Sequence, residues 1–139
     1  MSYLLDTNVL SELARPRKNQ GVLDWLAATR GWEHYVSVLT SGEPLRGVAK
    51  LRHRGDQRRA ATIEQFVFAT EQRFASRILA ITDDIVRVWA GQSRAEPVPV
   101  VDGLIAATAA VHGWTVVTPN VTDFERTGVP VLSPFSREE

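Results

Sequence analysis

The chain has 139 residues and no cysteine, a size typical of one domain, here spanning residues 1–139, and a composition that excludes disulfides and thiol chemistry. Its 16 basic and 16 acidic residues give a formal net charge of zero, which argues against a uniformly basic nucleic-acid-binding surface. Because Asp6 and Glu12 interrupt the only apolar N-terminal stretch and Leu104–Val111 is far shorter than the ~20 residues of a membrane helix, we expect a cytoplasmic protein.

Short apolar runs alternate with segments of helical spacing along the whole chain. Strands are predicted at residues 3–5, 34–40, 77–82, 114–118 and 128–134. Helices are predicted at residues 9–15, 22–27, 41–52, 57–76, 83–95 and 102–112, with a proline-marked loop at 97–99. Strands that alternate with helices in this way predict an α/β fold with a central parallel sheet flanked by helices.

Four acidic residues lie close to the expected ends of these strands. Asp6 directly follows the first strand, and Glu43 falls in the first turn of the helix after the strand at 34–40. Asp123 lies just beyond the strand at 114–118, and Asp102 opens the helix at 102–112. Because ligands of open parallel sheets bind beyond the carboxyl ends of the strands, we expect these four carboxylates to share one pocket.

Each of these acids also has a purely structural interpretation. The segment Thr40–Glu43 fits a capping box, in which the glutamate bonds back to a free amide at the helix start. Asp6 and Asp102 are acids of the kind that the helix dipole favours, and Asp123 is placed to cap a short turn. Taken singly, each acid is better explained by these structural roles.

Taken jointly, the four acids favour a metal site. Carboxylates that converge on one pocket raise one another's pKa unless a cation is present. The three histidines, His34, His53 and His112, have no ligand spacing. Because Mg²⁺ and Mn²⁺ prefer oxygen ligands, the pattern predicts one of these ions as cofactor.

Three segments carry a resemblance that spans essentially the whole chain. They are YLLDTNVLSEL at 3–13, SVLTSGEPLRGV at 37–48 and PVVDGLIAATAAVHGWTVVTPNVTDF at 99–124. In sequence and in order they resemble the PIN-domain ribonucleases, above all the VapC-like toxins of type II toxin–antitoxin pairs. The resemblance implies a PIN-like α/β/α sandwich and a Mg²⁺- or Mn²⁺-dependent endoribonuclease that hydrolyses phosphodiester bonds in single-stranded or loop RNA. It also implies a cognate antitoxin as partner, a homodimer, and a hetero-oligomer with the antitoxin.

The resemblance also implies roles for individual residues. The catalytic and metal-binding acids would be Asp6, Glu43, Asp102 and Asp123. Of these, Asp6 and Asp102 would be the leading ligands, while the other two would bind through water or hold a second ion. Hydrogen bonds that orient the acids are expected from Thr7, Asn8, Thr118 and Asn120.

Two prolines depart from the family pattern. Pro44 follows the second acid, and we expect it in the first helical turn, where a missing N–H is not needed. Pro119 stands where a family member usually has arginine, which removes a basic group near the pocket.

A basic stretch follows Glu43 and supplies the expected substrate contacts. The residues predicted to bind RNA phosphates are Arg46, Lys50, Arg52, Arg54 and Arg58, with Arg59 next to them in the same stretch. Basic faces are more often simply solvated, so this interpretation depends on the neighbouring acidic site.

Two other functions fit parts of the pattern. A phosphatase of the haloacid-dehalogenase kind also places an aspartate after its first strand, but it has a second acid two residues later, where this chain has Asn8. A non-catalytic RNA- or protein-binding module would keep the fold without needing four acids at one edge. Release of phosphate from a small phosphomonoester would favour the first, and RNA binding without cleavage the second.

Overall fold

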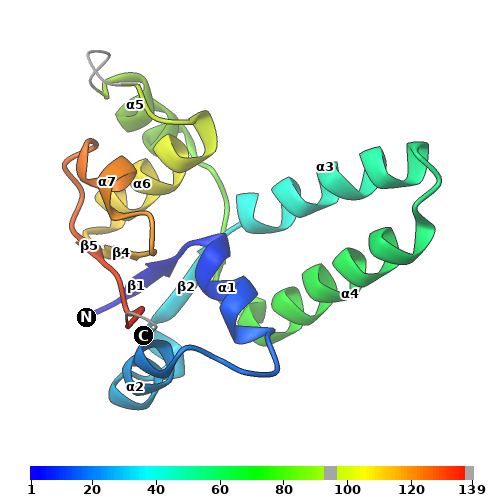
Figure 1. The fold of residues 1–139 in the computed structure, drawn as a ribbon. Coiled ribbons are helices and arrows are strands. Elements are labelled where there is room, and N and C mark those ends of the chain that lie inside the picture. The colour runs from blue at the N-terminus through cyan, green and yellow to red at the C-terminus, as the bar shows by residue number, and fades with distance from the viewer. Residues whose placement is uncertain (93–96, 137–139) are drawn as a thin grey trace.

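A single five-stranded parallel sheet forms the centre of the molecule (Figure 1). The computed structural model describes residues 1–92 and 97–136. The strands are β1 (Tyr3–Leu5), β2 (His34–Ser37), β3 (Ile78–Leu79), β4 (Thr115–Val117) and β5 (Val131–Leu132). They pair in the order β3-β2-β1-β4-β5, every pair parallel. The predicted fold class is therefore confirmed, with β1 at the centre of the sheet.

Seven α-helices in the described residues surround this sheet. They are α1 (Thr7–Leu13), α2 (Gln20–Ala28), α3 (Leu39–His53), α4 (Gln57–Phe74), α5 (Asp83–Ala90), α6 (Val100–His112) and α7 (Val121–Glu125). Figure 1 shows α3 and α4 as an antiparallel pair that projects from the sheet, and we call this pair the arm (residues 39–74). No helix within the described ranges is long and apolar enough to cross a bilayer.

Alternating side chains of the central strands build a core on each face of the sheet. Leu4 and Val116 pack with α6 and α7 on one face. Their neighbours Leu5 and Val117 pack with α1 and Phe74 of α4 on the other. Because successive side chains of a strand point to opposite faces, these short apolar runs cover both faces at once.

A small separate core holds the two helices of the arm together. Val48 and Leu51 of α3 pack against Ala60 of α4, with Ile63 beside them. Near this core Arg52 also bonds Gln57 and Glu64 of the facing helix. The arm therefore depends on few apolar contacts, and most of its surface stays exposed.

The chain leaves β2 earlier than predicted, which corrects the interpretation of residues 38–43. The Leu39 N–H donates to Ser37 Oγ (3.1 Å) and the Thr40 hydroxyl donates to the Ser37 carbonyl (2.6 Å). These bonds turn the backbone directly into α3, whose N-cap is Val38. The predicted capping box at Thr40–Glu43 is wrong, because these residues already lie inside the helix.

Other predicted boundaries shift by a few residues. The strand predicted at 77–82 is limited to Ile78–Leu79, and α6 begins at Val100, two residues before Asp102. The helix predicted at 83–95 ends at Ala90, and residues 93–95 of that prediction lie outside the described residues.

Asn19 joins the C-terminal segment to the loop before α2. Its side-chain oxygen accepts from the N–H groups of Ser136 (2.9 Å) and Gly21 (3.0 Å), while its amide nitrogen donates to the Ser136 carbonyl (3.0 Å). Its own N–H donates to the buried carboxylate of Glu12 (2.7 Å). The C-terminal segment is so close that a Cβ on Gly21 would lie 2.3 Å from the Pro134 carbonyl oxygen.

This close approach predicts a stability defect in Gly21→Ala. The added methyl must displace backbone atoms, which costs about 1–3 kcal/mol of unfolding free energy, as overpacking does in cores. Urea or thermal unfolding measures this loss. Gly31→Ala is the matched control, because a Cβ there meets no atom within 4 Å. Equal stability of the two variants would show that residues 134–136 do not pack as described.

Candidate functional site

The direction in which strands are added to the sheet reverses at β1. From β1 the chain builds β2 and β3 on one side of it and then returns to build β4 and β5 on the other. Such a reversal is the place where open parallel sheets bind ligands. Asp6 follows β1 and Thr118 follows β4, so both lie at this edge.

Asp6 is held in one orientation by hydrogen bonds to both carboxylate oxygens. Its Oδ1 accepts from the Thr7 N–H (2.8 Å), which caps α1. Its Oδ2 accepts from the Thr118 hydroxyl (2.8 Å) and from Asn8 Nδ2 (3.2 Å). Only 5% of Asp6 is exposed. A carboxylate that is buried but fully oriented is a suitable fixed ligand, because it needs no reordering when it binds.

The Thr118 hydroxyl connects Asp6 to Asp123. It donates to Asp6 and accepts from the Asn120 N–H (3.0 Å). The Asn120 side chain then donates to Asp123 Oδ2 (2.9 Å). Three of the four residues expected to orient the acids therefore contact one of them through their side chains.

Thr7 is the exception among these four residues. It contacts Asp6 through its backbone, whereas its buried hydroxyl oxygen has no hydrogen-bond partner in the described part of the chain. A buried hydroxyl without a partner costs free energy, so this position is suited to a water molecule or a metal-bound water beside Asp6.

Asp102 couples the four acids electrostatically. Burial, followed by the charges of Asp6, Asp123 and Glu43, raises the pKa of Asp102 to about 6. This happens although Asp102 lies in the first turn of α6, where the helix dipole favours an anion. The structure thus brings the four predicted acids within electrostatic reach of one another, and burial together with their repulsion outweighs the effect of the helix dipole on Asp102.

Glu43 belongs to α3 of the arm and interacts electrostatically with Asp6. Desolvation and, after it, the charge of Asp6 raise the pKa of Glu43. Because α3 begins at Leu39, Glu43 lies in its second turn and Pro44 lies inside the helix, not in its first turn as predicted. The proline has no N–H for the Thr40 carbonyl, so the helix is weakened close to Glu43.

The donor set fits a hard divalent cation that keeps much of its water. Within the described residues, no group of three or more Asp, Glu or His side chains is close enough to form a ready-made metal site. All four acids offer oxygen, however, and Mg²⁺ usually binds one or two carboxylates together with several waters. The unpartnered Thr7 hydroxyl is consistent with water at this place.

His34 has a structural role at the other end of the sheet. It is buried at the start of β2, stacks on Trp25 with ring centroids 4.8 Å apart, and its Nε2 lies 2.8 Å from the Thr29 hydroxyl. Burial lowers the pKa of this imidazole, with smaller effects from nearby charges.

Arg126 is a residue near the site that the sequence analysis missed. Its guanidinium Nη1 lies 3.8 Å from Asp123 Oδ1, so a basic group is present despite the proline at position 119. The signal was the i, i+3 spacing between an acid in the short helix α7 and the arginine at its C-cap. That spacing is common, which is why it did not distinguish this pair.

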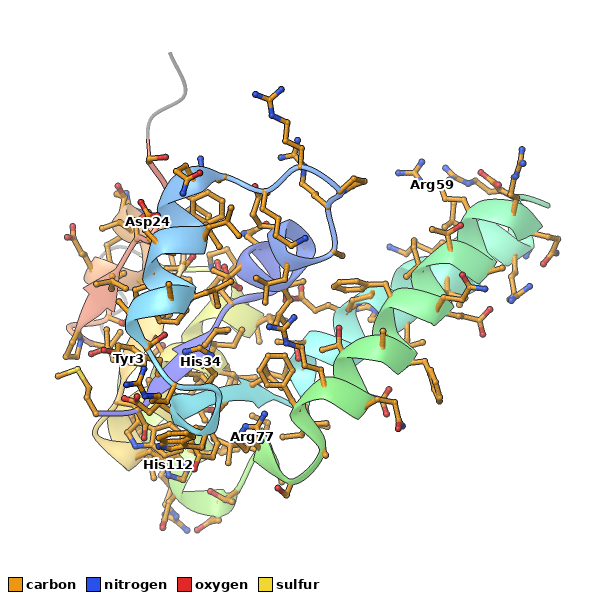
Figure 2. The ribbon with its side chains drawn as sticks, turned by 90° about the horizontal axis from the view of Figure 1, so that it is seen from below. Tyr3, Asp24, His34, Arg59, Arg77 and His112 are labelled. Carbon is orange, nitrogen blue, oxygen red and sulfur yellow. The ribbon has the colours of Figure 1, made fainter. Side chains whose placement is uncertain are left out.

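The predicted RNA-binding residues all lie exposed on the arm. Arg46, Lys50, Arg52 and Arg54 are on α3 or at its end, and Arg58 is on α4. Figure 2 shows the side chains of the arm, with Arg59 labelled far from His34 in the body. Among the residues that the structure describes, Arg52 is the one member of the predicted set that forms an ion pair with an acid, and the acid is Glu64.

Comparison with known proteins gives consistent matches. A family model described as PIN domain matches residues 3–130, which include all four acids. The chain is 32% identical over 137 residues to Toxin FitB of Neisseria gonorrhoeae, covering 95% of this chain and 97% of the relative. It is 30% identical over 137 residues to the VapC ribonuclease Y4jK of Sinorhizobium fredii, covering 95% and 96%. The crystal structure of FitAcB from Neisseria gonorrhoeae matches with a TM-score of 0.76 and 32% identity, covering 95% of this chain and 97% of that one.

Proposed function

This chain belongs to the PIN-domain family, and on that premise we propose that it is a Mg²⁺- or Mn²⁺-dependent endoribonuclease and the toxin of a toxin–antitoxin pair. The observation that carries the proposal is the electrostatic coupling of Asp102 to Asp6, Glu43 and Asp123 near the carboxyl edge of β1. Relatives covering nearly all of this chain are named as a toxin and as a ribonuclease, which supports the same conclusion.

In this proposal the acidic cluster prepares the site for RNA. Asp6 and Asp102 would hold the ion, with Glu43 and Asp123 as further ligands through water. A bound ion would lower the pKa of a water and neutralise charge on the phosphate under attack. Thr118 and Asn8 fix the Asp6 carboxylate, and Asn120 fixes Asp123, so the oxygens stay in place without further ordering.

No observation favours the phosphatase alternative. That mechanism needs a second acid two residues after the first, and Asn8 instead donates a hydrogen bond to Asp6 Oδ2. The amide is therefore committed to orienting the carboxylate.

An antitoxin is the partner we propose for the apolar groove between α1 and α4. Its lining residues are Leu10, Leu13, Ala14, Phe66, Ala69, Thr70, Arg73 and Phe74. An apolar segment of the antitoxin would cover this groove and exclude water from it, as helices and extended peptides do in hydrophobic grooves.

The direct test is cleavage of RNA by the purified protein. A random-sequence single-stranded RNA pool should be cut internally in Mg²⁺ or Mn²⁺, and a chelator should stop the reaction until excess metal is restored. A small phosphomonoester should release no phosphate under the same conditions. Failure to cut any RNA with either metal would refute the proposed activity.

A further inference from the structure

The basic residues of the arm fall into two groups that differ in their contacts. Arg52 is paired with Glu64 and Gln57 across the arm. Lys50, Arg54 and Arg59, in contrast, line a groove between α3 and α4 together with Gly47, Leu51 and Ile63. The groove has a volume of about 280 Å³, and the core residue Leu51 forms part of its wall. These three cations therefore share one concave surface.

The groove lies on the side of α3 that carries Glu43. Residues 43, 47, 50 and 54 follow the i, i+4, i+7, i+11 spacing that places side chains on one helix face. At 1.5 Å per residue, Lys50 is about 10 Å and Arg54 about 16 Å along the axis from Glu43. A strand leaving the acidic cluster along this face would meet the groove next.

The form of the groove suits a phosphate. Lys50 and Arg54 also line a second depression with Ala49 and His53, so their charges face open space on both sides. Gly47 adds no side chain, and a Cβ there would meet no atom within 4 Å. Lys50, Arg54 and Arg59 form no ion pair with a described residue, and all three are exposed, so their charge is available to a ligand.

We infer that the groove formed by Gly47, Lys50, Leu51, Arg54, Arg59 and Ile63 binds the RNA backbone several nucleotides away from the cleaved bond. This inference rests on the proposed ribonuclease function. The axial distances correspond to about three to five nucleotides at ~3.4 Å per stacked nucleotide. The groove would therefore favour long substrates over short ones, independently of the bases at the cut.

Binding of RNA in a chelator tests the groove without cleavage. The probe is a fluorescent 24-nucleotide random-sequence RNA, and its anisotropy is followed as a function of salt. Because each lost phosphate contact on single strands lowers the salt slope by about 0.7, Lys50→Gln and Arg59→Gln should each weaken binding roughly fivefold at 0.1 M salt. Arg58 was predicted from the sequence to bind RNA but does not line the groove, so Arg58→Gln, with the same charge change one residue from Arg59, tests whether the groove or the whole basic stretch binds. If the groove binds, this variant should weaken binding less than twofold.

A second pair of variants tests the shape of the groove without changing its charge. Gly47→Leu projects a side chain into the groove and should weaken RNA binding at least fivefold. Gly47→Ala adds only a methyl group at an open position and should bind like the wild type. The inference is wrong if Gly47→Leu binds normally, or if Arg58→Gln and Arg59→Gln lose affinity equally. The second result would indicate a general positive field instead of a site.

Cleavage of short and long RNA separates this inference from the proposed function. With Mn²⁺ the wild type should cut the 24-nucleotide pool at least fivefold more efficiently, by kcat/KM, than a three-nucleotide pool, which is too short to reach the groove from the cut. Lys50→Gln and Gly47→Leu should reduce this preference by raising KM for the long RNA. Equal cleavage of both pools by the wild type would refute the groove and leave the ribonuclease standing. Absence of any cleavage would refute the ribonuclease instead, and the inference with it.

Discussion

Asp6→Asn should lower RNA cleavage by about 10³-fold or more while the protein remains folded. Asparagine keeps the size of the side chain but removes the negative charge that we propose as the leading metal ligand. It also places an NH₂ group where one carboxylate oxygen accepts hydrogen bonds, from Thr118 and Asn8 on Oδ2 or from the Thr7 N–H on Oδ1. Initial rates of cleavage in Mg²⁺ and Mn²⁺, with far-ultraviolet circular dichroism as the folding check, measure this effect.

Thr118 provides a graded control for the same site. Thr118→Val keeps the buried shape but removes the hydroxyl that joins Asp6 to Asn120, so we expect a smaller loss, of about 10–100-fold. Thr118→Ser keeps the hydroxyl and should retain most of the activity. Retention of more than a tenth of wild-type cleavage by Asp6→Asn would contradict the assignment of Asp6.

The sheet and the placement of the acids were predictable because they depend on short-range patterns. The apolar pairs Leu4-Leu5 and Val116-Val117 mark strands that are buried on both faces, and each is followed by a polar residue. The carboxyl ends of parallel strands must lie at one edge, so the strand order alone brings Asp6 and Thr118 together.

The start of α3 was not predictable by the same means. The sequence Thr40–Glu43 satisfies the pattern of a capping box, yet the hydrogen bonds that Leu39 and Thr40 donate to Ser37 begin the helix earlier. Ser37 is fully buried in the sheet, and burial of that kind depends on contacts distant in sequence. Local propensity therefore gave the right element with the wrong first turn.

The ion pair between Arg52 and Glu64 could not be predicted from the sequence either. Arg52 and Glu64 are 12 residues apart and meet only because α3 and α4 form a hairpin. The predicted basic strip treated Arg52 as equivalent to Lys50, whereas the two differ in how far their charge is available. The same limit applies to Thr7, which was expected to orient Asp6 by a hydrogen bond: it does so through its backbone N–H, and its hydroxyl makes no bond with a described residue.

Asp102→Asn should stabilise the metal-free protein above pH 6 although it removes a proposed ligand. The pKa of Asp102 is raised to about 6 from an ordinary value of 3.8, so the folded state is penalised whenever this carboxyl is ionised. The penalty is absent below about pH 4, develops as pH rises, and is complete above pH 6. About two pKa units, discounted for solvent screening, correspond to a gain of about 1–2 kcal/mol for the variant at pH 7.5.

Thermal unfolding in a chelator, at pH 4 and at pH 7.5, measures this effect. For a chain of this size the gain should raise Tm by about 3–8 °C at pH 7.5 and vanish at pH 4. Asp84→Asn is the matched control, because Asp84 is also an acid in the first turn of a helix, α5, but is exposed and far from the cluster in sequence. It should give no gain, since it loses only a favourable dipole interaction.

Added Mg²⁺ or Mn²⁺ should reverse the order of the two proteins. A cation that binds only the folded state stabilises it in proportion to RT ln(1 + [M]/Kd), so the wild type should gain Tm with metal concentration and Asp102→Asn should gain less. The carboxylate that destabilises the metal-free fold is thus the one that makes the fold responsive to metal. A variant less stable than wild type at pH 7.5 without metal would show that burial and the neighbouring acids do not penalise the ionised Asp102 carboxylate as described.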